Sequence, residues 1–304
     1  MKKYFNNIPT FLKSRFLLPA VLLCLQAGLA IGQDTTLAPA PKKVKPVKNT
    51  FGSNYIIDNQ SVMVPIKGSL EFAIQHRFGT WDNGKKDFWG MFAPTNIRLA
   101  MNYSPINKLY VGAGITKERY QIDFNAKYAL LQQTTDNSMP ISLTYFGNMV
   151  IDARDKSNFV NSVDRFSYYN ELIVARKITE KFSAQVSANY SWFNNVEGYV
   201  DEKGEVQNKM YNGHFAFAIY GRYKITEKSA IIAGYNQPVT QHPTNNPHPN
   251  ICFGFETTTS AHSFQVFATN YYGIVPQSNN MYNQNDYTNN QFLIGFNITR
   301  LWNY

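Results

Sequence analysis

The sequence predicts an all-β protein, a closed antiparallel up-and-down transmembrane β-barrel of about twelve strands. Three observations predict this fold. From about residue 66 to the C-terminus, segments of roughly ten to fourteen residues alternate between apolar and polar side chains. Short and long connections alternate between these segments, and aromatic residues gather at the segment ends. Alternation with a period of two places successive side chains on opposite faces of a strand, as in a barrel wall with lipid outside and a lumen inside.

The composition of the 304 residues excludes several other classes of protein. Charged residues make up 16% of the chain and aromatic residues 15%, whereas soluble domains carry about 25% charged residues. Only one stretch approaches the roughly 18 apolar residues of a membrane-spanning helix, which argues against a helical membrane protein. The apolar content of 44% argues against intrinsic disorder. Two cysteines are too few for a scaffold held by disulfides.

Residues 1–32 have the organisation of a secretory signal peptide. Four basic residues and no acidic residue occur among the first fifteen positions, an apolar run follows over Phe16–Leu25, and small residues follow that run. We expect cleavage before Gln33. A membrane anchor is the alternative, but the run is short for a spanning helix and a proline-rich segment follows it. Cys24 would leave with the signal, so that Cys252 is the only thiol of the mature chain.

Residues 33–50 form a Pro/Lys-rich segment that we interpret as a periplasmic linker. Proline alternating with lysine and alanine favours an extended, solvated chain. Its basic run could also attract anionic headgroups, although a spacer is the simpler interpretation. Of the net charge of +9, four units belong to the signal and three to this linker, which leaves +2 for residues 51–304. The basic composition therefore does not indicate a nucleic-acid partner.

The barrel is expected over residues 51–304, after a short lead-in segment. One clear strand alternates Phe182, Ala184 and Val186 with Ser183 and Gln185, whereas a helix would repeat its apolar residues every three or four positions. The twelve expected strands lie near residues 66–78, 93–104, 109–118, 120–131, 140–153, 166–178, 182–194, 211–224, 229–238, 250–258, 262–272 and 290–302. The register near 166–178 is ambiguous.

The connections between these segments follow the pattern of outer-membrane barrels, which have short periplasmic turns and long external loops. The connections after even-numbered strands are mostly short, and those after odd-numbered strands are mostly long, with one tight exception near 117–119. Residues 177–181 recur as residues 224–228, and both copies fall in short turns, which suggests repeated hairpin chemistry. An even number of strands would leave both chain ends in the periplasm.

A membrane barrel explains the strands better than a soluble sandwich or soluble barrel does. The segments match the roughly 9–11 residues of a tilted membrane-spanning strand, whereas soluble strands average about 5–6 residues. The polar face that runs from Ser183 to Ser191 would need many partners in a soluble core, but it suits a hydrated lumen. Aromatic residues near strand ends are expected at the membrane interface: Tyr103, Tyr110, Tyr190, Trp192, Trp302 and Tyr304.

The C-terminal segment from Gln291 to Tyr304 alternates and ends in an aromatic residue. It resembles the closing strand of outer-membrane proteins, which the barrel-assembly machinery reads during biogenesis. We therefore expect a location in the cell outer membrane after export by a cleavable signal peptide. The expected partners are outer-membrane lipid, the barrel-assembly machinery and, in addition, an unknown envelope protein. No nucleic acid is expected.

Several short strings give the chain a family resemblance. Residues 59–62, 67–72, 75–79, 96–99 and 295–300 resemble a Bacteroidota family of membrane-bound β-barrels, which is classed as a domain of unknown function. The resemblance spans about residues 59–304 and is most specific over residues 76–79. It implies an outer-membrane location. It implies no activity and no catalytic residues.

Motifs for catalysis or cofactor binding are missing from the sequence. It has no cysteine pair with metal spacing, no phosphate-binding glycine loop and no nucleophile elbow. His242 and His248 share a proline-rich loop and could hold a metal, although such loops often carry histidines by chance. His76 and His214 lie near the expected external rim, but no serine or aspartate is tied to either by spacing. We therefore expect no enzyme activity, no catalytic residue, no metal and no cofactor.

Charged residues on the inward faces of the strands are the candidate functional residues. They are Glu71, Arg98, Asp123, Lys127, Asp152, Glu171, Arg222 and Glu256. One interpretation is a constriction that selects solutes by charge. The other is a network of ion pairs and hydrogen bonds that fills a narrow barrel, which the nearly balanced signs favour.

Three functions are compatible with this sequence. The first is a small passive channel or transport component for an unknown solute. The second is a non-conducting barrel that scaffolds or docks a partner through its long Asn/Tyr-rich loops. The third is a barrel hydrolase. The sequence leaves open the solute, the oligomeric state and whether the lumen is open.

Overall fold

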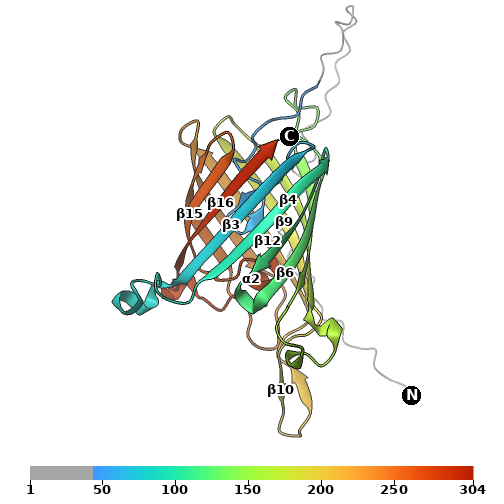
Figure 1. Cartoon of the computed structure of the whole chain (residues 1–304), viewed down its shortest axis with the longest axis vertical. Coiled ribbons are helices and arrows are strands. Elements are labelled where there is room, and N and C mark those ends of the chain that lie inside the picture. Colours follow the sequence, from blue (N-terminus) through green and yellow to red (C-terminus); the bar gives the residue numbers. More distant parts are fainter. Residues whose placement is uncertain (1–43, 304) are drawn as a thin grey trace, which may run out of the picture. The chain divides into compact units, whose positions relative to one another are not determined.

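The computed structural model describes residues 44–303. The predicted signal peptide, most of the predicted linker and Tyr304 lie outside the described residues. Among residues 44–303, every helix is too short or too polar to cross a membrane. The described part of the chain is built mainly from antiparallel strands (Figure 1).

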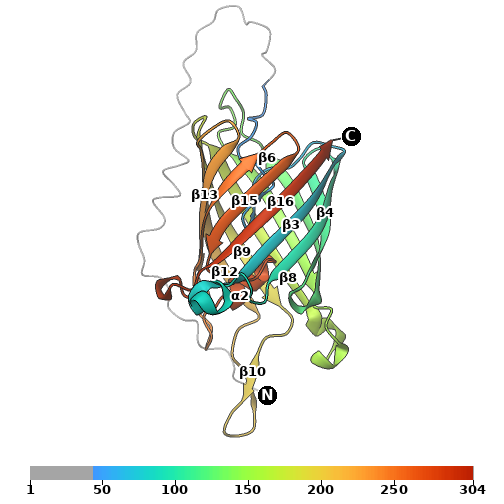
Figure 2. The same cartoon turned by 60° about the vertical axis from the view of Figure 1, so that its left-hand side comes forward.

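A closed barrel of twelve antiparallel strands forms the body of the structure, and all twelve predicted strands are confirmed. The last strand pairs with the first from Asn303↔Ser69 to Leu293↔Thr80, which closes the sheet (Figure 2). Closure leaves no strand edge unpaired, as a sheet in lipid requires. The strands are β3 (Ser69–Thr80), β4 (Asn96–Ile106), β5 (Leu109–Thr116), β6 (Gln121–Leu131), β7 (Ser142–Ile151), β8 (Phe166–Lys177), β9 (Phe182–Phe193), β12 (Gly213–Lys224), β13 (Ser229–Pro238), β14 (Asn250–Thr258), β15 (His262–Thr269) and β16 (Leu293–Asn303).

The two faces of the wall are reversed relative to a soluble protein. Along β6, Asp123 and Lys127 are fully buried while Phe124 and Tyr128 are exposed. The same alternation of buried and exposed residues runs through β8 and β9. Apolar side chains therefore cover the outside, where lipid would lie, and polar side chains line the inside. We call these inward-facing side chains the lumen wall.

Short turns gather at one end of the barrel and long loops at the other (Figure 1). The repeated turn sequences have a structural reason, since Thr179 and Thr226 each accept two backbone N–H bonds of their own turns. The long loops carry the remaining short elements. These are η1 (Trp81–Asp87), η2 (Glu118–Tyr120), η3 (Lys156–Asn158), η4 (Ser162–Arg165), the hairpin of β10 (Gly198–Val200) and β11 (Val206–Asn208), α2 (Pro276–Tyr282) and η5 (Tyr287–Asn289).

Two segments that the strand pattern does not predict fill the inside of the barrel. The lead-in segment forms a small hairpin of β1 (Tyr55–Ile56) and β2 (Asn59–Gln60), which appears in blue within the barrel in Figure 1. The loop between β15 and β16 contributes α2, whose residues from Gln277 to Met281 are buried. The lumen is thus occupied from both ends.

Candidate functional site

The segment Phe51–Met63 enters the lumen and returns, and we call it the lumen hairpin. Phe51 and every residue from Ser53 to Val62 are buried, although only four of them belong to strands. Its hydrogen-bond partners come from nine of the twelve wall strands. The hairpin therefore lies across the lumen and not against one side of it.

The tip of the lumen hairpin is a strained turn. Ile57 adopts a positive φ of 60°, which glycine or asparagine takes far more readily than a β-branched residue. The surrounding wall holds this turn through side-chain amides. Asn297 Nδ2 donates to the Ile57 carbonyl oxygen at 2.6 Å, and the Ile57 N–H donates to Gln265 Oε1 at 3.2 Å. A residue in this conformation costs about 1–2 kcal/mol, so the contacts around it must offset that cost.

Asp58 joins the hairpin tip to the wall and to the loop that carries α2. Its carboxylate accepts hydrogen bonds from Tyr271 at 2.6 Å, from Tyr220 at 3.2 Å and from Asn279 Nδ2 at 3.5 Å. Asp58 belongs to the hairpin and not to a membrane-spanning strand. Burial raises the pKa of its carboxyl group, while the tyrosine hydrogen bonds and the charge of Arg77 act in the opposite direction.

Three of the charged residues predicted for the lumen contact the lumen hairpin directly. Glu71 accepts a hydrogen bond from Asn54 Nδ2 at 2.6 Å, and Glu171 accepts one from Asn59 Nδ2 at 2.9 Å. Lys127 donates to the carbonyl oxygens of Asn54 and Ser61, both at 3.2 Å, and to Gln60 Oε1 at 3.1 Å. The neutral amide and carbonyl groups of the hairpin therefore solvate these wall charges in place of water.

Four more of the predicted residues form ion pairs along the wall. Arg98 binds Asp123 through two hydrogen bonds of 2.8 and 2.6 Å, a bidentate geometry that is strong when buried. Arg222 pairs with Glu256 at 2.7 Å. Both pairs have side chains that are at most about a tenth exposed. The wall charges thus largely cancel one another.

The eighth predicted residue, Asp152, lies directly after β7 at the end with the long loops. It pairs with Arg154 at 2.7 Å, and it lines a cavity of about 220 Å³ together with Arg165, Glu197 and Tyr282. Asp152 is therefore at the mouth of the barrel and does not reach the lumen hairpin. The structure brings the other seven residues into the lumen and leaves this one at its rim.

The aromatic residues predicted for the membrane interface divide into three groups. Tyr103, Tyr190 and Trp192 are exposed on the outer face. Trp302 is partly exposed and lies beneath the Arg300 guanidinium, and Tyr304 is outside the described residues. The prediction for Tyr110 is wrong, because this side chain is fully buried and its hydroxyl donates to Glu71 in the lumen. A strand-end tyrosine faces whichever side its place in the alternation dictates.

Helix α2 occupies the lumen from the end with the long loops. Gln277 donates to Asn148 Oδ1 at 3.0 Å, and Asn280 donates to Asn189 Oδ1 at 2.7 Å. Asn236 in turn donates to Asn280 Oδ1 at 2.7 Å. The sequence pattern predicts only a long connection between the expected strands at 262–272 and 290–302. A signal was present, since Pro276 suits the first turn of a helix and an unusually amide-rich run follows it.

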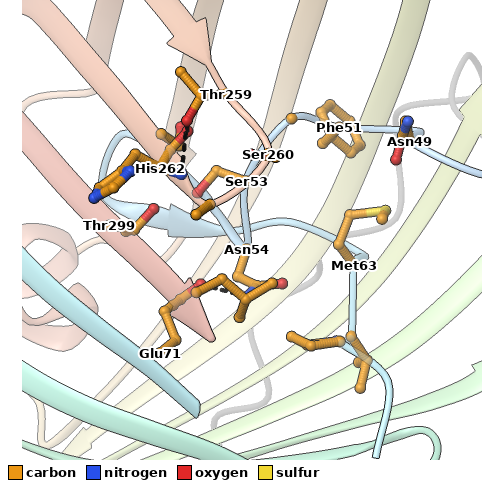
Figure 3. A pocket seen from close by; sticks show the side chains of 16 residues that line it. Asn49, Phe51, Ser53, Asn54, Met63, Glu71, Thr259, Ser260, His262 and Thr299 are labelled. Atoms are coloured by element: carbon orange, nitrogen blue, oxygen red, sulfur yellow. Dashed lines mark hydrogen bonds between the residues drawn. The ribbon is translucent and has the colours of Figure 1, made fainter. Parts of the chain in front are cut away.

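A cavity of about 230 Å³ remains beside the lumen hairpin at the end with the short turns. Figure 3 shows Phe51, Ser53 and Met63 of the hairpin segment around it, with His262 and Thr299 on the facing wall. The hairpin is therefore not sealed against the wall at this rim.

Two of the five histidines, His214 and His242, form a stacked pair near the end with the long loops. His214 Nδ1 and His242 Nε2 lie 2.9 Å apart, and His242 Nδ1 accepts the Tyr211 N–H, so both ring nitrogens of His242 are used. Burial lowers the pKa of His242, which favours the neutral imidazole that this arrangement needs. Within residues 44–303, no group of three or more His, Cys, Asp or Glu side chains is placed to hold a metal ion.

Comparison with known proteins adds a family and several similar folds. A family described as a membrane-bound β-barrel domain, of unknown function, matches residues 51–302. The NanC porin is 11% identical, with 77% of this chain and 99% of that chain covered and a TM-score of 0.47. An outer-membrane channel from Pseudomonas putida F1 is 12% identical, covering 79% and 97% with a TM-score of 0.45. No curated protein matches the chain. The family match includes the lumen hairpin.

Proposed function

The chain belongs to the family of membrane-bound β-barrel domains, and from this premise we propose that it is a small passive channel of the outer membrane that its own lumen hairpin closes. The solute passage is the polar lumen. The closed state is the one described above, with the hairpin and α2 inside the barrel. Opening requires the hairpin to leave the lumen, and α2, which enters from the opposite end, must leave a passage beside it.

The observation that carries this proposal is the way the lumen hairpin is attached. Both of its ends lie at the rim of short turns. The Val47 N–H donates to the Gln133 carbonyl oxygen there, and the Lys67 N–H donates to Asn107 Oδ1 in the turn after β4. A segment that enters and leaves by one rim can be withdrawn through that rim without threading.

The wall behind the hairpin suits the passage of small polar solutes. Its inward face carries Asn, Gln, Ser and Thr side chains, which water can solvate once the hairpin has left. Because the buried pairs Arg98–Asp123 and Arg222–Glu256 cancel their charges, we expect weak selection between cations and anions. The protein is accordingly proposed to have no enzyme activity.

A second candidate function is docking of an envelope partner, and one feature favours it. The β10–β11 hairpin projects from the end with the long loops (Figure 2). Its residues Tyr199, Val200 and Val206 are 46%, 67% and 76% exposed. Exposed apolar side chains on a projecting hairpin are typical of a contact surface. Deleting residues 198–208 would abolish partner capture under this alternative and would leave conductance unchanged under the channel proposal.

Planar-bilayer recording tests the channel proposal. The full chain should be silent for most of the recording, whereas a variant that lacks residues 51–63 should give stable conductance steps. Heat-modifiable gel migration must first show that the variant barrel is folded. A folded variant that gives no conductance steps would contradict the proposal.

A further inference from the structure

We propose that the open lumen binds peptides by their backbone, and that the lumen hairpin occupies this peptide site in the closed state. The inference rests on the proposed channel function and names the solute class of that channel. It is drawn from the atoms that the wall uses to hold the hairpin, many of which contact main-chain groups and not side chains.

Gln265, on β15, forms two hydrogen bonds with the main chain of the first arm of the hairpin. Its Nε2 donates to the Tyr55 carbonyl oxygen at 2.9 Å, and its Oε1 accepts the Ile57 N–H at 3.2 Å. One side-chain amide thus satisfies the acceptor of residue i and the donor of residue i+2. Glu256 fixes the orientation of this amide, because its Oε2 accepts from the same Nε2 at 2.9 Å. The arrangement is pre-organised by the wall itself.

Gln185, on β9, repeats this geometry on the second arm. Its Nε2 donates to the Gln60 carbonyl oxygen at 2.8 Å, and its Oε1 accepts the Val62 N–H at 3.1 Å. The spacing is again residue i to residue i+2. The strands β12, β13 and β14 separate the two glutamines around the barrel. Two separate clamps with one geometry indicate recognition of a peptide backbone, since each needs a carbonyl and an N–H at that spacing.

Other wall side chains also bind main-chain carbonyls of the hairpin. Lys127 donates to Asn54 and Ser61, Thr144 donates to Val62 at 3.0 Å, and Asn297 donates to Ile57. These hydrogen bonds involve no side chain of the hairpin, so a peptide of different sequence with the same backbone conformation can make them. Such a site is therefore tolerant of peptide sequence.

A sugar is the main alternative solute, because amide and tyrosine side chains also bind hydroxyl groups. The clamps favour a peptide, since each glutamine uses its donor and its acceptor at once on a carbonyl and an N–H. A sugar hydroxyl can act as either donor or acceptor, and it therefore requires no such fixed pairing. The lumen also offers Lys127 and the carboxylates of Glu71 and Glu171 for the opposite charges of a peptide.

The inference is tested by measuring how an added peptide blocks the ionic current through the barrel that lacks residues 51–63. The probe is a synthetic peptide with the sequence of residues 51–63, compared with a scrambled version, with a version N-methylated at the positions of Ile57 and Val62, and with a linear maltose oligosaccharide. We expect the first two to block the current, the native sequence more tightly because its Asp58 also accepts from Tyr220 and Tyr271. N-methylation removes the two N–H groups that donate to the Oε1 atoms of Gln265 and Gln185. It should therefore weaken block at least about tenfold. The sugar should not block.

Wall variants provide the matched control. In the same barrel, Gln265→Met and Gln185→Met keep the side-chain volume and remove the amide, and each should weaken peptide block about tenfold. Ser263 lies two residues from Gln265 on the same inward face, and Ser263→Ala should leave the block by the peptide unchanged. Equal block by the N-methylated peptide, or block by the sugar at the same concentration, would overturn the inference.

Peptide binding can also be measured without conductance, which separates this inference from the channel proposal. Fluorescence anisotropy of the labelled peptide with the barrel in detergent should show the same tenfold difference on N-methylation. Binding without conductance would contradict the channel proposal alone, and conductance without binding would contradict the peptide inference alone. If the deletion fails to fold, the full chain with Tyr55→Ala and Asp58→Ala loosens the hairpin while keeping the wall intact, and it should bind the peptide more tightly than the unmodified chain does.

Discussion

The barrel wall and the lumen hairpin are held by different forces. Each wall strand has two neighbours joined by long antiparallel ladders, and its apolar face is turned outward. The hairpin has only two paired residues in each arm, a strained turn at Ile57 and side-chain hydrogen bonds to its surroundings. Because the wall forms a closed ladder and the hairpin does not, the hairpin can move while the wall stays intact. This contrast is why we propose the hairpin as the element that opens and closes the lumen.

The largest effect is expected from breaking a buried ion pair of the wall. Arg98→Leu should lower the free energy of unfolding by about 3–5 kcal/mol, because the Asp123 carboxylate stays buried without its partner. Denaturant unfolding in lipid vesicles would measure this loss. The double variant Arg98→Leu with Asp123→Leu should recover most of it, and a double variant as unstable as the single one would show that the pair is not the cause.

A charge on the outer face should have the next largest effect. Ile219 is 54% exposed near the middle of β12, and Ile219→Arg should destabilise the barrel by about 2–4 kcal/mol if lipid covers this position. Ile219→Leu is the control and should change stability little. An arginine tolerated without cost in vesicle unfolding would argue that this face does not contact the bilayer core.

Loss of the Asp58 carboxylate should loosen the hairpin and spare the wall. Asp58→Ala leaves the hydroxyls of Tyr220 and Tyr271 without their acceptor, which costs about 1–3 kcal/mol of hairpin docking. Hydrogen exchange should then increase over residues 51–63, while the amides of β12 and β15 stay protected. Faster exchange throughout the strands would show that the hairpin and the wall form one cooperative unit.

A change of pH should have a smaller effect on the docking of the hairpin. Burial raises the pKa of Asp58 above its ordinary value of 3.8, so the docked hairpin holds this proton more tightly than the free hairpin does. Docking should therefore be strongest below about pH 3.8 and weaken as the pH rises through the raised pKa. Hydrogen exchange over residues 51–63 as a function of pH would measure this, after correction for the intrinsic exchange rate. If the Asp58→Asn variant kept the same pH dependence, titratable groups other than Asp58 would be its cause.

The smallest effect is expected in the short turns. The Lys177–Glu180 pair has a glutamate side chain that is 90% exposed, and such surface pairs contribute little. Glu180→Gln should therefore leave both wall stability and hairpin exchange unchanged within experimental error. A clear change in hairpin exchange would show that this turn holds the predicted linker or the hairpin in place.

The sequence predicts the wall because its information is local. Alternation specifies each strand, and it also predicts that residues such as Arg98 and Lys127 face inward, where the structure buries them. The alternation also points Tyr110 inward, and the wrong prediction for this residue comes from taking its position at a strand end as a sign of the membrane interface. The ambiguity at Glu171 is resolved only by its neighbours, since Leu172 is exposed on the outer face.

The sequence does not predict the lumen hairpin or α2 because their information is long-range. The arms of the hairpin are two residues long and show no period. Their contacts join residues as far apart as Ile57 and Asn297, and no local pattern marks those partners. A filled lumen is among the interpretations that the balanced charges suggest, but the segments that fill it emerge only from the closed barrel.

Thiol modification during single-channel recording tests most directly whether the hairpin closes the lumen. Ser61 is fully buried in the hairpin, and Ser61→Cys in a Cys252→Ala background places one thiol there. A charged methanethiosulfonate reagent is applied from the side of the short turns. We expect modification only during current-carrying periods, after which the channel stays open because the charged adduct cannot return to the lumen. Modification at the same rate while the channel is silent, or current that flows while this thiol remains protected, would contradict the claim that the hairpin closes the lumen.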